Sequence, residues 1–203
     1  MTENKNQLLK LDLQHFAANK VNFGLKNVHY APITEVDGKI TYGTPIRIPG
    51  AVTLTLTPRG ELVEFHADNM VYYAAATNDG YDGTLAIANV PEQFAIDALG
   101  EEKDEVDGVL TEKADAKQKD FAFMFEFDGD VKATRHVMYK CSANRPTISG
   151  ATTTSTKDPQ TSELTFISTA RPSDYAVKTK TTAATTPEIY DAWYNAVYEK
   201  ATP

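Results

Sequence analysis

The four histidines and the single cysteine are the side chains best suited to ligate a metal or to form a nucleophile–base pair. The histidines stand at positions 15, 29, 66 and 136, and the cysteine is Cys141. The chain has no HxH, HExxH or paired-cysteine pattern, so a zinc site lacks its usual ligand set. On one strand, His136 and Cys141 are five residues apart and face opposite sides unless a bulge intervenes. We therefore expect Cys141 to be a small apolar filler.

Adjacent carboxylates are the other candidates for chemistry. They occur at Glu101 and Glu102 and at Asp104 and Glu105, with Asp107 close behind. A catalytic pair needs two unequal, partly buried environments that separate its pKa values. These residues instead lie in the charge run LGEEKDEVDGVL, which is typical of a solvated face. The chain also has no GxSxG, Walker or GxGxxG motif, so we predict no enzyme, no cofactor and no metal.

The acidic residues are concentrated in one part of the chain. The sequence has 203 residues and a formal net charge of −8, and residues 97–130, the acidic window, hold twelve acids and four lysines. That window accounts for the whole excess of acidic over basic residues in the chain. Tight binding to phosphate backbones requires clustered Lys and Arg, so an acidic chain argues against it.

The hydropathy pattern predicts neither a membrane span nor a signal peptide. No apolar run approaches the roughly 18 residues needed to cross a bilayer. The opening MTENKNQLLKLDLQHFAANK interrupts its leucines with Lys10, Asp12 and Gln14, which a secretory apolar core would not contain. We expect one soluble domain, no membrane partner, and synthesis in a reducing cytoplasm.

Strand patterns dominate the elements that would position these residues. AVTLTLT at 51–57 alternates Val52, Leu54 and Leu56 with threonines, which predicts one buried face. FAFMFEF at 121–127 places four phenylalanines on one side, and the DGD that follows predicts a hairpin turning at Asp128-Gly129. Thirteen threonines between 147 and 186 favour extended chain there.

Asp-Gly steps predict turns at five places in the chain. Two of them, Asp79-Gly80 and Asp82-Gly83, fall in the stretch ADNMVYYAAATNDGYDGTL at 67–85. A calcium loop needs acidic ligands at alternate positions before its glycine and a closing glutamate, which this stretch lacks. We therefore predict hairpin turns here, with Tyr72 and Tyr73 on opposite faces of a strand.

Two short helices complete the pattern. VPEQFAIDALGEE predicts a helix of about nine residues that starts at Pro91 and stops at Gly100. TTPEIYDAWYNAVYEK predicts a helix near 187–199, with Thr186 as N-cap, an apolar face for docking, and a tyrosine stripe beside it. The expected fold is mainly β, a β-sandwich or barrel with one or two short flanking α-helices.

Several of these stretches, in order, resemble one known family. VNFGLKNVHYAPI, the run from IPGAVTLTLTPRGELVEFHADNMVYYAAATNDGYDGTLAIANVPEQFAIDALG, then DGVL, FAFMFEFDGD, RHVMYKC and RP are similar to the major tail proteins, or tail tube proteins, of long-tailed bacteriophages that infect Gram-positive bacteria. The resemblance runs from about Val21 to the terminal WYNAVYEKATP. The leading LLKLDLQHFAA is similar instead to a segment at the start of head and other structural proteins of such phages.

This resemblance implies a β-sandwich of the tail-tube type whose copies form hexameric rings, stacked into a hollow tube. Residues 20–203 would be the tube domain, and residues 1–19 an N-terminal arm that is disordered, cleaved or part of the assembly. The implied partners are the chain itself, tape measure, tail terminator and baseplate-type proteins, and double-stranded DNA that passes without specific binding. The protein would be made in the host bacterial cytoplasm and reside in the virion tail.

Two sets of residues are candidates for assembly. A long acidic loop near 100–119 would line the lumen, lie on the outer wall or order on ring stacking, and exposed aromatics would touch a neighbouring copy. The acidic residues are Glu101, Glu102, Asp104, Glu105 and Asp107, and the aromatics are Tyr81, Tyr190 and Tyr194.

Two other functions are compatible with the same pattern. A carbohydrate-binding β-sandwich would use exposed tyrosines as sugar platforms and would hold Trp193 on an open face. Another virion protein, such as a tail terminator or head decoration protein, would form one ring or a scattered coat without polymerising.

Overall fold

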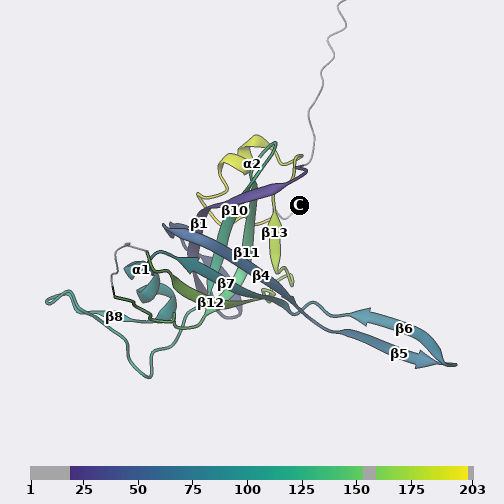
Figure 1. Ribbon diagram of the computed structural model, residues 1–203, viewed down its shortest axis with the longest axis horizontal. Coiled ribbons are helices and arrows are strands. Elements are labelled where there is room, and N and C mark those ends of the chain that lie inside the picture. Colours follow the sequence, from purple (N-terminus) through teal and green to yellow (C-terminus); the bar gives the residue numbers. More distant parts are fainter. Residues whose placement is uncertain (1–18, 153–158, 201–203) are drawn as a thin grey trace, which may run out of the picture.

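The computed structural model describes residues 19–152 and 159–200, and these are mainly strand. Strands make up 49% and helices 7%, so the predicted β class with two short helices is confirmed (Figure 1). The N-terminal arm predicted over 1–19 lies outside the described residues except for Asn19. The strands are β1 Asn22–Val36, β2 Lys39–Tyr42, β3 Ile46–Arg47, β4 Ala51–Arg59, β5 Leu62–Ala67, β6 Met70–Ala76, β7 Gly80–Ile87, β8 Glu102–Lys103, β9 Leu110–Thr111, β10 Phe121–Gly129, β11 Thr134–Ala143, β12 Ser162–Thr169 and β13 Lys178–Lys180; the helices are α1 Glu92–Phe94, η1 Ala95–Leu99 and α2 Pro187–Asp191.

One large antiparallel sheet forms the body of the molecule. Its strands follow the order β2-β1-β10-β11-β12-β7-β4, with β13 paired to β11 and β3 paired to β1. Irregular register in β1, where Asn27 has a left-handed φ of 48°, bends that strand. The sheet curls far enough to bring β1 close to β4, so its inner face encloses a core (Figure 1).

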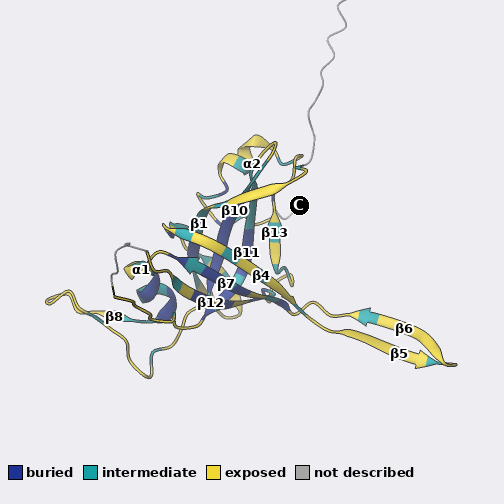
Figure 2. Ribbon diagram, in the orientation of Figure 1, coloured by how far each residue is buried: buried dark blue, intermediate teal, exposed yellow. Residues whose placement is uncertain are grey.

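The central strand β10 is buried on both faces. Phe121, Phe123 and Phe125 pack into the inner core, as their alternation predicts. Ala122 and Met124 face the other way and are covered by Trp193 and Val197 from residues 187–199, hereafter the C-terminal segment. The fold is therefore layered, with α1 and η1 packed into one side of the sheet and the C-terminal segment on the other (Figures 1 and 2).

The hairpin predicted between residues 121 and 141 is confirmed, but its turn lies further along. Asp128 and Gly129 are still in β10 and pair with Phe23 and Asn22 of β1, so the turn falls at 130–133. The Asn19 side chain explains the shift because its Oδ1 accepts hydrogen bonds from the N–H groups of Val131 and Lys132, at 3.2 and 3.1 Å.

The strand predicted at 51–57 is present as β4, but one of its predicted core residues is exposed. Leu54 and Leu56 pack against the core, whereas Val52 is 55% exposed. A register shift between Ala51 and Thr53 breaks the alternation and turns Val52 outward. β4 is also the last strand of the sheet order, so its outer edge has no strand partner among the described residues.

The prediction of turns at Asp79-Gly80 and Asp82-Gly83 is wrong. Gly80, Asp82 and Gly83 lie in β7, between β4 and β12. Gly83 is required because the Phe166 ring packs against it, and a Cβ there would come within 2.2 Å of that ring. The Asp37-Gly38 step does form the predicted tight turn, with positive φ at both residues.

The first helix lies where it is predicted, although its second part, η1, is a π-helix, and the second helix is shorter than predicted. α1 and η1 run from Glu92 to Leu99 and stop at Gly100, whose φ of 79° is left-handed. α2 ends at Asp191, well before residue 199, and turns follow through residue 195. The Trp193 N–H bonds back to Tyr190 O, three residues earlier, which tightens the chain as Trp193 enters the core. In the described part of the chain, no helix has the length and hydropathy of a membrane span.

Candidate interaction site on the projecting hairpin

Residues 62–76, strands β5 and β6 with their turn, form a hairpin that projects far from the body (Figure 1). It continues the β4–β7 ladder outward. The N–H of Asp79 donates to Arg59 O at 3.1 Å, and the N–H of Thr77 donates to Glu61 O at 3.0 Å. Gly60 permits the crossing at this junction, since its φ is 140° and a Cβ would lie 2.2 Å from Thr77 O. The body's own strands therefore support this projecting hairpin.

The tip of the projecting hairpin is a two-residue turn at Asp68 and Asn69. Their φ values are 53° and 60°, the left-handed conformation that a primed turn requires at both positions. Asp and Asn tolerate this conformation better than other non-glycine residues. The pair stands between two extended stretches, so this turn could have been predicted from the sequence in place of the Asp-Gly turns proposed nearby.

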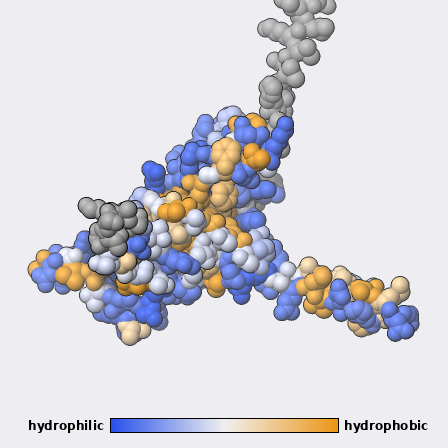
Figure 3. Space-filling view, viewed as in Figure 1, coloured by the Kyte–Doolittle hydropathy of each residue, from blue (hydrophilic) through white to orange (hydrophobic). Residues whose placement is uncertain are grey.

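The projecting hairpin exposes its large apolar side chains. Seven of them are between 48% and 71% exposed, and the hairpin is predominantly yellow in Figure 2 and carries much orange in Figure 3. These residues are Leu62, Val63, Phe65, Met70, Val71, Tyr72 and Tyr73. A contiguous exposed apolar patch on a protein marks an interaction site, and a two-stranded hairpin alone is marginally stable in water.

The pairing of β5 with β6 separates two faces. Phe65 lies opposite Tyr73, and Val63 lies opposite Ala75, which gives one strongly apolar face. Glu64 lies opposite Ala74 on the other face. The Phe65–Tyr73 pair is therefore the best candidate for a buried contact with a partner, since aromatic anchors dominate binding energy at interfaces.

The acidic residues proposed for assembly lie on a second projection, the hairpin β8–β9 and the chain that follows (Figure 1). Glu102 pairs with Lys113, with 2.5 Å between Oε2 and Nζ. Asp104 Oδ1 accepts from the N–H groups of Val106 and Asp107, which lowers the pKa of Asp104. Asp107-Gly108 lies in the turn, as predicted.

Four exposed acids of this projection form no ion pair among the described residues, namely Asp104, Glu105, Asp107 and Asp115. Glu101 is half-buried beside the end of η1, where its N–H donates to Ala95 O. The loop therefore offers a partner a net negative surface. Its role in stacking or in lining a lumen stays a prediction.

The three candidate aromatics are used within the chain. Lys178 Nζ lies 4.2 Å from the centre of the Tyr81 ring. The Tyr190 hydroxyl donates to Ala133 O at 3.0 Å, and the Tyr194 hydroxyl donates to Glu126 at 3.2 Å. Their predicted contact with a neighbouring copy stays a prediction. Within the chain, Tyr190 and Tyr194 anchor the C-terminal segment.

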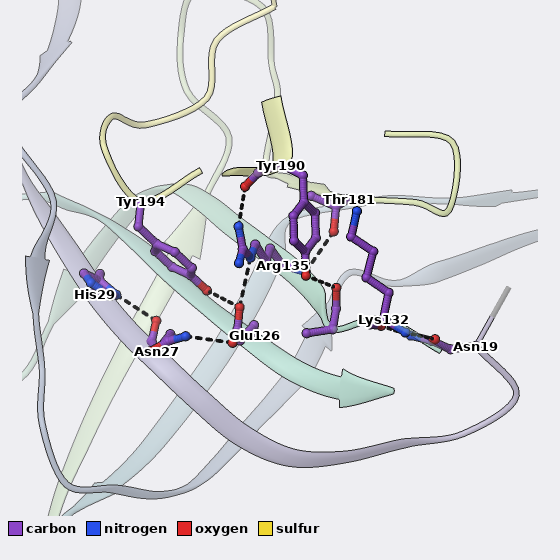
Figure 4. A network of polar contacts seen from close by, with 10 residues as sticks. Asn19, Asn27, His29, Glu126, Lys132, Arg135, Thr181, Tyr190 and Tyr194 are labelled. Atoms are coloured by element: carbon purple, nitrogen blue, oxygen red, sulfur yellow. Dashed lines mark hydrogen bonds and ion pairs between the residues drawn. The ribbon is translucent and has the colours of Figure 1, made fainter. Parts of the chain in front are cut away.

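Glu126 is the centre of that anchor (Figure 4). It is only 5% exposed, and it accepts hydrogen bonds from Asn27, Arg135 and Tyr194. Arg135 also donates to the carbonyl oxygen of Tyr190, and its guanidinium lies 3.7 Å from the centre of the Tyr190 ring. Burial and the nearby Glu126 charge raise the pKa of Tyr194 far above its ordinary value.

Arg171 anchors the far end of the C-terminal segment. It is 7% exposed, donates to both carboxylate oxygens of Asp174, and donates to Glu199 at 3.2 Å. The contact with Arg171 lowers the pKa of Asp174 to about 2. Two nearly buried arginines thus fix the segment that covers the outer face of the sheet, and sequence reasoning identified neither.

The His136 and Cys141 pair has no geometry for nucleophilic catalysis. A register shift in β11 puts Cys141 opposite Phe121, while His136 lies opposite Phe125 and stacks on it, so His136 and Cys141 lie on the same face of the strand. The intervening bulge thus overturns the expected separation onto opposite faces. Burial raises the pKa of the Cys141 thiol to about 12 and, with Lys180 and Lys178, lowers that of His136 to about 4. The described residues include no group of three or more His, Cys, Asp or Glu placed to hold a metal.

Neither a protein-family model nor a curated protein matches the chain. The geometry of the projecting hairpin and the chemistry of its residues are therefore the evidence for an interaction site.

Proposed function

We propose that this chain is a structural protein that polymerises, as stacked hexameric rings, into the hollow tail tube of a long-tailed bacteriophage. The tube would conduct the genome during delivery. The chain would have no catalytic role, and its principal partner would be a second copy of itself. Tape measure, tail terminator and baseplate-type proteins would be further partners in the virion.

The projecting hairpin is the observation that carries this proposal. It holds seven exposed large apolar residues away from the body, where the described chain offers them no cover. A lone protein would place such residues in its core, since burying one contributes about 1.5–3 kcal/mol. A second copy that received the hairpin would bury them and would itself present the same hairpin onward. Such a head-to-tail contact propagates a stack.

The free edge of β4 supports ring closure. An unpaired strand edge is a template for pairing with another chain, and closure of a ring removes it. Thr53, Thr55 and Thr57 are exposed on this edge strand, which suits a wall with a wet face.

Charge supports a conduit and argues against a DNA-binding site. The acidic window gives the chain its net charge of −8, and acids repel phosphates. DNA must slide through a tube, and neutralising contacts from clustered Lys and Arg would instead retain it. The proposed interaction with DNA is therefore passage without specific binding.

The carbohydrate-binding alternative loses one of its expected features. Trp193 is 3% exposed and packs against the sheet, so it offers no platform for a sugar. Tyr72 and Tyr73 are exposed, and they keep this alternative open to test. A single-ring or decoration protein would share the interaction surfaces but would not form long stacks.

Negative-stain electron microscopy of the concentrated, purified chain tests the proposal. We expect regular hollow filaments with a repeating axial spacing. Monomers that persist at high concentration and bind a glycan array would favour the carbohydrate-binding alternative. Closed single rings that do not elongate would favour a terminator.

A further inference from the structure

A hollow of 310 Å³ lies between the start of β1, the β10–β11 turn and the end of β13. The hollow includes no residue of the projecting hairpin, and the proposed assembly contacts do not involve it. The side chains that matter for its chemistry are those of Asn19, Lys132, Thr134, His136, Lys180 and Thr182.

The charge of this hollow is opposite to that of the protein. Lys132 and Lys180 line it, and no Asp or Glu is among its lining residues, although the chain as a whole carries −8. Within the described residues, neither lysine forms an ion pair with a carboxylate. Lys132 Nζ lies 3.5 Å from the centre of the Tyr190 ring (Figure 4). This cation–π contact holds the ammonium group in position but leaves its positive charge without a counter-charge.

The walls of the hollow are held in place before any ligand arrives. Asn19 Nδ2 donates to Lys132 O at 2.6 Å and to Thr134 Oγ1 at 3.1 Å, and Asn19 Oδ1 accepts from the turn. The Thr181 N–H donates to Arg135 O at 2.8 Å, which ties the end of β13 to β11. A preorganised site loses little entropy when it binds.

His136 supplies a neutral wall. Its ring stacks on Phe125, with 4.9 Å between ring centres and 3° between planes. Burial is the main cause of its low pKa, and Lys180 and Lys178 lower that pKa further, so the ring is neutral near pH 7. A neutral imidazole still carries one N–H donor that an oxyanion can accept from.

We propose that this hollow, the lysine hollow, binds a small dianionic oxyanion of the phosphate or phosphate-monoester class. Lys132 and Lys180 would supply charge-assisted hydrogen bonds, which are stronger than neutral ones. The hydroxyl of Thr182 and the imidazole would complete the donor set. Two cations from separate elements match the charge of a dianion, whereas a monovalent anion would neutralise only one of the two lysines.

Equilibrium dialysis with radiolabelled inorganic phosphate tests the proposal on the full chain in whatever assembly state it adopts. At constant ionic strength and about pH 7.5, where phosphate is mostly dianionic, we expect saturable binding of one phosphate per chain. The expected Kd is on the order of 1 mM. Lys180→Gln should weaken binding by about tenfold or more, because it removes one of the two cations.

Lys178→Gln is the matched control. Lys178 is on the same short strand and contributes to the same potential at His136, but it contacts Tyr81 and does not line the hollow. This variant should bind phosphate nearly as the native chain does. Absence of saturable binding would overturn the proposal, as would equal losses in the Lys178 and Lys180 variants, because general attraction by surface lysines would explain the latter.

Discussion

Arg135 and Glu126 lie opposite each other on β11 and β10, and their side chains form an ion pair with 3.0 Å between Nε and Oε2. The Glu126 side chain is 7% exposed and that of Arg135 17%. The pair also holds Tyr190 and Tyr194, so a contact between two neighbouring strands fixes the distant C-terminal segment. Because both side chains are largely buried, removing either one would leave the charge of the other without its partner.

Glu126→Ala should destabilise the fold strongly. It leaves the Arg135 charge buried without its partner, and breaking such a pair costs about 3–5 kcal/mol of unfolding free energy. Urea denaturation followed by the fluorescence of Trp193 measures the loss. Asp128→Ala, on the same strand as Glu126, breaks a more exposed ion pair with Lys26 of β1; it is the control and should change the midpoint little. A Glu126→Ala midpoint that stays as close to the native value as that of Asp128→Ala would contradict a stabilising role for the buried pair.

Stability should fall as the pH drops from about 6.5 to about 4, in part because of His136. Its folded-state pKa of about 4 lies below the ordinary 6.5, so the unfolded chain binds the proton more readily. The contribution is complete above pH 6.5 and is lost as the pH approaches 4. We expect about 1–2 kcal/mol, after allowing for partial exposure of the ring.

His136→Phe isolates this contribution. It keeps an aromatic ring against Phe125 and removes the titration, so unfolding free energy should depend less on pH in this window. His29, whose pKa burial also lowers, leaves a residual slope in the variant. Superimposable pH profiles of the native chain and the variant would contradict the assignment.

Cys141 should resist thiol reagents in the native protein. It is fully buried, and with a pKa of about 12 roughly one thiol in ten thousand is ionised at about pH 8. Ellman's reagent should therefore react with one thiol per chain only after addition of urea, and Cys141→Ser provides the blank. Rapid native modification would mean that β11 opens far more readily than its burial implies.

The sequence predicts elements better than it predicts where they lie. The phenylalanines of β10 and the glycine stop at Gly100 follow from alternation and helix-end chemistry, and both are present. Val52 and Gly83 show the limit. A bulge turns Val52 outward, and Gly83 accommodates the Phe166 ring instead of making a turn. Both outcomes depend on neighbouring strands that a local pattern does not contain.

The candidate site shows the same limit. β5 and β6 have the apolar residues of ordinary core strands, and only the fold reveals that they project from the body. The tyrosine stripe of the C-terminal segment predicts a face for a neighbour, but Glu126 and Arg135 from β10 and β11 occupy it within the chain. Contacts between residues distant in sequence decided both cases.

The Phe65–Tyr73 pair is the part of the projecting hairpin that tests self-assembly most sharply. Phe65→Ser combined with Tyr73→Ser removes the two aromatic anchors of one face. Glu64→Gln combined with Ala74→Ser alters the cross-strand pair on the opposite face and serves as control. Because these side chains are exposed in the single chain, both variants should keep the native thermal midpoint at low concentration.

Sedimentation velocity of the native chain and these two variants at the same high concentration is the most direct measurement. We expect the native chain and the control to sediment as large polymers, and the Phe65→Ser/Tyr73→Ser variant to remain in small species. Polymers formed equally by all three proteins, or by none of them, would contradict assembly through the projecting hairpin.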